Sequence, residues 1–135
     1  MRTLIVDDVT LARNLLRRYL DKDPEIEIVG ECANGREAIT AIKNLAPDLV
    51  FLDVQMPKIG GFEVVETVGA ANMPRVIFVT AHDEFAFKAF GLNALDYILK
   101  PFDEERLTNC VRHAKSQMKF DEPDGLRLSG RAITE

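Results

Sequence analysis

The chain has 135 residues, and 47% of them are hydrophobic, which is enough apolar material for one domain with a buried core. Its 17 basic and 22 acidic residues give a formal net charge of −5, which excludes a broad nucleic-acid surface on this domain. No segment approaches the roughly 18 consecutive apolar residues of a membrane span, and an expected strand begins almost at once, so we expect a cytoplasmic protein without membrane contact.

Short apolar runs alternate with segments of helical period along the chain, which is the pattern of repeated βα units. We predict five strands, at residues 2–6, 25–31, 48–52, 75–80 and 95–99. Crossovers between parallel strands are right-handed, so five such units have few compact arrangements. The commonest is a doubly wound α/β fold, flavodoxin-like, with a five-stranded parallel sheet of order 2-1-3-4-5 and helices on both faces.

Helix signals fill the segments between these strands. Leu11, Leu15 and Tyr19 recur at i, i+4 and i+8, which predicts an apolar helical stripe. Asn34 followed by Glu37 resembles a capping box at the start of the next helix. Glycines open and close the third expected helix, and an aspartate caps the last one: Gly60-Gly61, Gly69 and Asp103.

Acidic residues follow two of the expected strands. The run at 4–6 ends at Asp7 and Asp8, and the run at 49–52 ends at Asp53. In the predicted strand order these two strands flank the switch point of the sheet, so three carboxylates should gather at its carboxyl edge. Adjacent carboxylates stay ionised only when a cation shares their site, and an all-oxygen donor set suits Mg²⁺.

Two further polar residues end strands at the same edge. Thr80 closes the run at 75–80 and Lys100 follows the run at 95–99. Four strand ends then each deliver a group that phosphoryl transfer uses, with Asp53 as the candidate nucleophile. An acidic residue at a strand end is more often a helix cap, and capping is the default for Asp8 taken singly, but capping does not explain the convergence of three carboxylates.

In combination, these motifs resemble those of a bacterial two-component response regulator receiver domain. The resemblance covers residues 1–119 and depends on four segments: Val6-Asp7-Asp8, Leu52-Asp53-Val54-Gln55-Met56-Pro57, Val79-Thr80-Ala81 and Leu99-Lys100-Pro101. It implies a phosphorylation-activated signalling switch that receives its phosphoryl group from a sensor histidine kinase. It also implies a protein that is not an enzyme beyond catalysing its own phosphorylation and dephosphorylation.

The resemblance implies a role for each residue near the metal. Asp53 would accept the phosphoryl group, Asp7 and Asp8 would help hold Mg²⁺, and Gln55 would offer the metal its backbone carbonyl. Gln55 and His82 occupy positions that tune dephosphorylation in the family. Their identities depart from those of the chemotaxis regulator, so the lifetime of the phosphoryl group stays open.

The resemblance also implies how the signal leaves the site. Lys100 would pair with the phosphoryl group, Thr80 would hydrogen-bond to it after transfer, and Tyr97 would be the switch aromatic. Family members carry a cis peptide bond at Lys100-Pro101. The switch would then report on the face formed by the fourth helix, the fifth strand and the fifth helix.

The stretch from Ala81 to Tyr97 resembles, more specifically, receivers attached to LytTR-type DNA-binding domains. This resemblance implies that residues 120–135 are a linker or tail leading to an output domain that the chain lacks. DNA binding and transcription regulation would then occur only through that domain. We therefore expect a shortened form of a longer protein, with a stand-alone receiver that acts through protein contacts as the alternative.

Three phenylalanines are concentrated in the expected fourth helix. Residues two apart on a helix lie on opposite sides, so Phe85, Phe87 and Phe90 cannot all face one core. At least one of them should be exposed, on the face where the switch reports. This pattern indicates a partner surface, with homodimer formation as one use of it.

Two other classes of protein remain open. A Mg²⁺-dependent phosphatase of small molecules also uses a strand-end aspartate, but it needs a second acid where this chain has Gln55 and a lid for which there is no long insertion. A flavin-binding module shares the strand topology, but the acidic loop at 7–10 would repel a phosphate.

Overall fold

The computed structural model describes residues 1–120 and contains a parallel sheet of order β2-β1-β3-β4-β5, which confirms the predicted topology. The strands are β1 (Arg2–Val6), β2 (Glu27–Cys32), β3 (Leu49–Leu52), β4 (Arg75–Thr80) and β5 (Asp96–Leu99). The helices are α1 (Thr10–Leu20), α2 (Gly35–Leu45), α3 (Gly61–Val68), α4 (Ala86–Gly91) and α5 (Glu104–Phe120), with 3₁₀ turns η1 (Ala70–Asn72) and η2 (Asp83–Phe85). The predicted tail from residue 121 onward lies outside the described residues.

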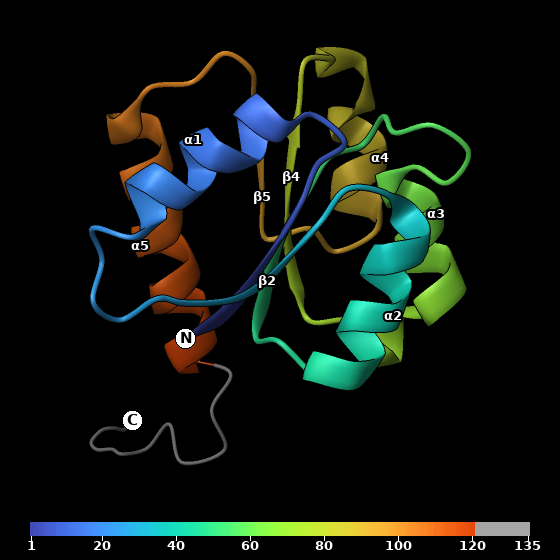
Figure 1. Ribbon diagram of the computed structural model, residues 1–135, viewed down its shortest axis with the longest axis horizontal. Helices are drawn as coiled ribbons and strands as arrows, with labels where there is room; N and C mark the ends of the chain where they lie inside the picture. The colour runs from blue at the N-terminus through green and yellow to red at the C-terminus, as the bar shows by residue number, and fades with distance from the viewer. Residues whose placement is uncertain (121–135) are drawn as a thin grey trace. The chain divides into compact units, whose positions relative to one another are not determined.

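The first described unit spans Met1–Phe102 and holds the whole sheet. Figure 1 shows α1 on one side of the sheet and α2, α3 and α4 on the other. Helices therefore cover both faces of the sheet, as is usual for parallel sheets. Leu52 and Phe78 belong to the core on the α2–α4 side, while Phe51 and Ile77 point the opposite way, and each of these four side chains is fully buried.

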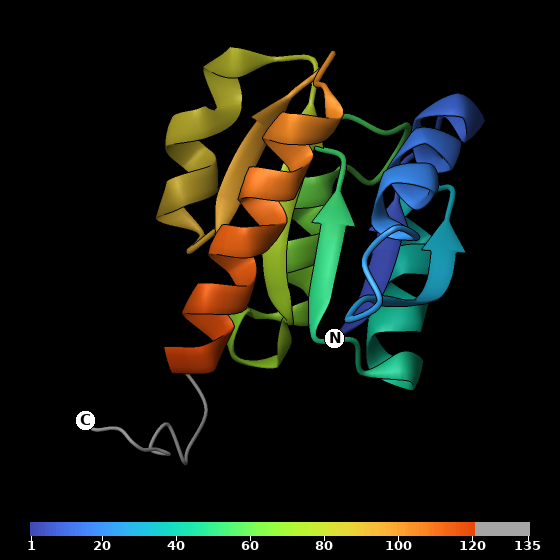
Figure 2. The ribbon, with the colours of Figure 1, turned by 90° about the vertical axis from the view of Figure 1, so that its left-hand side faces the viewer.

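All five strands run in one direction, and Figure 2 shows their carboxyl ends along one edge. β1 and β3 are direct neighbours at the centre, with Val6 paired to Leu52. The polar residues that follow these strands are thus brought to one edge of the sheet.

The start of β2 differs from the prediction. The strand begins at Glu27 rather than at residue 25, because the Asp23 carboxylate accepts a hydrogen bond from the Glu25 amide (2.9 Å) and a turn forms there. It runs one residue further than predicted, to Cys32, whose carbonyl accepts a hydrogen bond from the Asp7 amide (3.1 Å). The other strands agree with the prediction to within one residue at each end.

The cap of α2 is close to the predicted capping box. Asn34 accepts a hydrogen bond from the Glu37 amide at 2.8 Å, as expected. The return bond goes to a different donor, because the Glu37 carboxylate accepts from the Ala33 amide (2.9 Å). The helix start predicted from these two residues is confirmed.

The second unit begins at Asp103, and its described part contains α5. The Asp103 carboxylate accepts a hydrogen bond from the Arg106 amide (2.8 Å), which is the predicted cap. Across residues 1–120, no helix combines the length and apolar character needed to cross a bilayer.

Candidate functional site

Two of the predicted site residues, Asp7 and Asp53, directly follow strands. The backbone hydrogen bonds between neighbouring strands extend one residue past the strand ends, to these two residues. The Asp53 amide donates to the Val6 carbonyl (3.0 Å), which joins the residue after β3 to the end of β1. The Asp7 amide donates to Cys32 on the neighbouring β2 (3.1 Å). The backbone amides of both aspartates are therefore held by hydrogen bonds to the neighbouring strand.

The structure brings Asp7, Asp8 and Asp53 together at this edge. One carboxylate oxygen from each residue lies within 4.8 Å of the others. Asp7 and Asp53 are buried, whereas Asp8 is exposed. A cluster of three carboxylates with one exposed member is open to a cation from solvent on that side.

Asp7 has both of its carboxylate oxygens occupied by protein donors. Its Oδ1 accepts a hydrogen bond from the Val9 amide (2.9 Å), and its Oδ2 lies 2.6 Å from the Lys100 ammonium. The side chain is 1% exposed, so this ion pair is almost fully shielded on the aspartate side. Lys100 thus provides the counter-charge for a buried carboxylate.

Asp53 shares the same ammonium at a longer distance. Its Oδ2 lies 3.6 Å from Lys100 Nζ, and its Oδ1 accepts a hydrogen bond from the Gln55 amide (3.3 Å). Burial raises the pKa of Asp53 from 3.8 to about 6; the Lys100 ammonium acts against this rise and the Asp7 carboxylate adds to it. The site therefore carries more negative charge than its one ammonium neutralises.

Thr80 and Tyr97 meet at the backbone of His82. The Thr80 hydroxyl, which is fully buried, accepts a hydrogen bond from the His82 amide (3.4 Å). The Tyr97 side chain lies inward, 8% exposed, and its hydroxyl donates to the His82 carbonyl. Burial, followed by the Glu84 carboxylate, raises the pKa of the Tyr97 phenol. The shared role of the His82 backbone was not anticipated, because backbone groups carry no sequence signal.

The remaining predicted site residues lie as follows. Gln55 is exposed in the loop after Asp53, and the Lys100-Pro101 peptide bond is cis, as the resemblance implied. Phe87 and Phe90 on α4 are 92% and 59% exposed, which confirms that at least one aromatic faces solvent. Phe85 is half-buried, with its ring 5.9 Å from that of Phe62 and in an edge-to-face arrangement.

Sequence reasoning gave no role to Arg13, which the structure places beside the acidic loop. Its guanidinium donates to the Asp7 carbonyl at 2.6 Å. In the sequence Arg13 is one polar residue on the solvated side of an amphipathic helix. Nothing in its spacing sets it apart from the other arginines of that helix.

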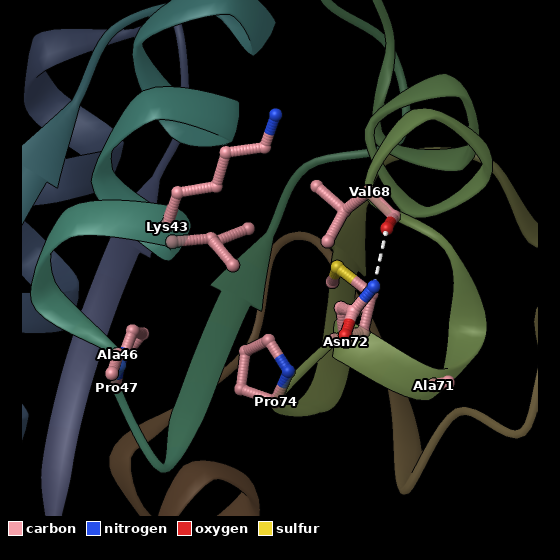
Figure 3. Close-up of a pocket in the computed structure, with 9 residues that line it drawn as sticks. Lys43, Ala46, Pro47, Val68, Ala71, Asn72 and Pro74 are labelled. Atoms are coloured by element: carbon pink, nitrogen blue, oxygen red, sulfur yellow. Dashed lines mark hydrogen bonds between the residues drawn. The ribbon is translucent and has the colours of Figure 1, made fainter.

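A concave region of about 460 Å³ lies elsewhere, between the end of α2 and the η1 turn (Figure 3). Apolar side chains and two prolines dominate its lining, which consists of Ile42, Lys43, Ala46, Pro47, Val68, Ala71, Asn72, Met73 and Pro74. None of the predicted site residues belongs to this lining. The candidate site is the carboxylate cluster rather than this cavity.

Gly61 lies against the backbone carbonyl of Asp53, and its replacement tests that contact. A Cβ at this position would overlap the Asp53 carbonyl oxygen and lie 3.1 Å from the carbonyl carbon. We expect Gly61→Ala to lower the free energy of unfolding by about 1–3 kcal/mol, because rigid backbone must move. Urea unfolding measures this change.

Gly91 is the matched control for that substitution. A Cβ there meets no atom within 4 Å, and the residue lies in α4. Gly91→Ala should be neutral or stabilising by up to about 1 kcal/mol. Equal losses for the two variants would show that the close approach at Gly61 is not the cause.

With this geometry established, residues 3–112 match the family model described as the response regulator receiver domain. The chain belongs to this family. Among curated proteins, it is 51% identical over 111 residues to an uncharacterized response regulatory protein of Yersinia pestis, covering 82% of this chain and 47% of that protein. It is 47% identical over 117 residues to the transcriptional regulatory protein BtsR of Escherichia coli (strain K12), covering 87% and 49%.

Solved structures give the same assignment. The response regulatory domain of mrkE from Klebsiella pneumoniae has a TM-score of 0.81 at 30% identity, with 88% of this chain and 98% of that chain covered. The CheX-CheY-BeF3-Mg+2 complex from Borrelia burgdorferi has a chain with a TM-score of 0.78 at 26% identity, covering 85% and 89%. This chain spans about half the length of the curated relatives that it matches.

The family match determines the general class of function. The chain is the receiver domain of a two-component response regulator, and such domains are generally non-enzymatic signalling domains that interact with histidine kinases and other partners. The family generally binds Mg²⁺ at an acidic pocket, and this chain has a cluster of three carboxylates. The match favours a receiver over the phosphatase and flavin alternatives.

Proposed function

We propose that this receiver domain is a phosphorylation-activated switch in which Asp53 accepts a phosphoryl group from a sensor histidine kinase. The observation that carries the proposal is the convergence of Asp53 with Asp7, Asp8 and the Lys100 ammonium at one edge of the sheet. This arrangement combines a nucleophile, a hard-cation donor set and a fixed positive charge.

The donor set fits Mg²⁺. One oxygen from each of three carboxylates lies within 4.8 Å of the others. Burial raises the pKa of Asp53, and the neighbouring Asp7 and Asp8 carboxylates add to the rise, so a divalent cation at this position would find a concentrated negative charge. Asp7, Asp8, Asp53 and the backbone carbonyl of Gln55 would hold the ion. When bound, Mg²⁺ supplies charge neutralisation for the phosphoryl oxygens. A similar solved structure is a complex that contains Mg²⁺ and BeF₃, which supports this assignment.

The residues of the chain divide the transfer between them. Asp53 forms the new bond from a carboxylate oxygen to phosphorus as the bond from phosphorus to the donor imidazole breaks. Lys100 needs little movement, because its ammonium already lies 3.6 Å from Asp53. It would pair with an oxygen of the transferred group, so its role is to neutralise negative charge on that group and to orient it.

Thr80 and Tyr97 would carry the signal away from the site. We propose that the Thr80 hydroxyl donates a hydrogen bond to the phosphoryl group, which carries about −1.5 to −2 charge. The inward Tyr97 is bonded to the same loop residue, His82, so movement of that loop and of the tyrosine would be coupled. The α4 and β5 surface is the two-state element that this coupling would bias.

The output of the switch is proposed to be transcription regulation through a DNA-binding domain of LytTR type. Two observations support it: the relatives are about twice as long as this chain, and one of them is the transcriptional regulatory protein BtsR. Residues 120–135 would then form the connecting segment. Phe87 and Phe90 would provide a partner surface, with a second copy of the chain as the proposed occupant.

Intact-mass spectrometry after incubation with acetyl phosphate tests the proposal. We expect the mass of one phosphoryl group to be added when Mg²⁺ is present, and to be absent in a chelated sample and in Asp53→Asn. Asp21→Asn, an exposed aspartate at the end of α1, is the matched control and should be phosphorylated normally. Phosphorylation that persists in Asp53→Asn would contradict the assignment of the phosphoacceptor.

A further inference from the structure

Arg13 connects the acidic loop to the neighbouring strand. From α1, its Nη1 donates to the Asp7 carbonyl (2.6 Å) and its Nη2 donates to the Thr10 hydroxyl (3.2 Å). Its Nε pairs with Glu31 on β2 at 3.4 Å. The side chain is only 16% exposed, so the guanidinium is held between α1, the β1–α1 loop and β2. The planar guanidinium group of arginine carries several N–H donors, so it can bind these three partners at once.

The contacted carbonyl belongs to the peptide group that joins Asp7 to Asp8. The Asp7 carboxylate is already fixed by the Val9 amide and Lys100. Asp8 is different, because within residues 1–120 its side chain makes no hydrogen bond or ion pair with the protein. The direction of the Asp8 side chain therefore depends on its backbone, and Arg13 holds the peptide group before it.

We propose that Arg13 is a positioning residue that orients Asp8 toward the divalent cation. A charge-assisted bond to the Asp7 carbonyl restricts rotation of the Asp7–Asp8 peptide group. Glu31 holds the guanidinium from the other side, so the bond does not depend on a free side chain. This inference rests on the proposed function, because it requires that the carboxylate cluster binds Mg²⁺.

Arg17 provides a closely matched comparison. It lies one turn further along α1 and pairs with the same Glu31, with Nε and Oε2 2.5 Å apart. Of the contacts formed among residues 1–120, those of Arg17 do not include the β1–α1 loop. Removing either arginine thus takes one positive charge and one Glu31 ion pair from α1, but only the loss of Arg13 frees the Asp7 carbonyl.

The test is Mg²⁺ affinity, measured by isothermal titration calorimetry on the 135-residue chain. We expect Arg13→Met to weaken binding by about 10-fold or more, as loss of a residue that orients a metal ligand typically does. Arg17→Met should bind within about twofold of the unsubstituted chain. Arg13→Lys keeps the charge but lacks the planar fork, so its affinity should stay closer to that of Arg13→Met.

A second readout needs no metal. In metal-free protein, we expect Arg13→Met to shift the backbone amide resonances of Asp8 and Val9, and Arg17→Met to leave them in place. Equal affinities for the two methionine variants, or full recovery by Arg13→Lys, would overturn the positioning role and leave the proposed function intact. Absence of Mg²⁺ binding by the unsubstituted chain would overturn both.

Discussion

Replacing Lys100 with methionine should lower the free energy of unfolding by about 3–5 kcal/mol at neutral pH, because it leaves a buried carboxylate without its partner. Asp7 is 1% exposed and lies 2.6 Å from the Lys100 ammonium. The same substitution removes the cation that lowers the pKa of Asp53. Denaturant unfolding in metal-free buffer measures the loss.

Lys43→Met is the control for the loss of a lysine as such. Lys43 is exposed on α2, so its replacement should change stability by no more than about 0.5 kcal/mol. A Lys100 variant as stable as the Lys43 variant would contradict the view that Lys100 neutralises the cluster. Added Mg²⁺ should restore part of the lost stability, since it provides a replacement positive charge.

Replacing Asp53 with asparagine should raise the free energy of unfolding near neutral pH, by up to roughly 3 kcal/mol in the absence of divalent cations. Burial raises the pKa of Asp53 from 3.8 to about 6, so the folded protein binds this proton more tightly than the unfolded chain does. As the pH rises from about 4 to about 6, the carboxylate therefore destabilises the folded state. Asparagine does not ionise and avoids this destabilisation.

The pH dependence is the diagnostic part of this prediction. The gain of Asp53→Asn should be small below about pH 4, develop between about pH 4 and 6, and stay constant above that range. Unfolding curves across this range measure it, with exposed Asp21→Asn as the control. A gain of equal size at every pH would assign the effect to packing or hydrogen bonding instead of to ionisation. Saturating Mg²⁺ should reduce the gain.

Much of the architecture could be predicted because its causes are local. Apolar runs such as Leu49–Leu52 are buried on both faces of a parallel sheet, so they appear in sequence without alternation. The handedness of crossovers then restricts the strand order. Polar residues directly after such runs, among them Asp53 and Lys100, lie at one edge of the sheet because the strands are parallel and their carboxyl ends meet there.

The contacts that these residues make could not be predicted in the same way. The inward Tyr97, its bond to the His82 carbonyl and the edge-to-face contact of Phe85 depend on which rotamer the surrounding core allows. The late start of β2 depends on a turn made by Asp23. Each of these side chains could make several alternative contacts, and neither residue spacing nor strand period shows which one forms.

The sequence by itself determined the order of the elements and the set of groups at the carboxyl edge, because apolar periodicity and strand ends are properties of neighbouring residues. Only the tertiary structure decided how those groups are charged and held. Asp53 has a raised pKa because the assembled core removes its solvent, and Arg13 reaches the Asp7 carbonyl because α1 packs beside β2. Burial and long-range contact exist only after the chain has folded.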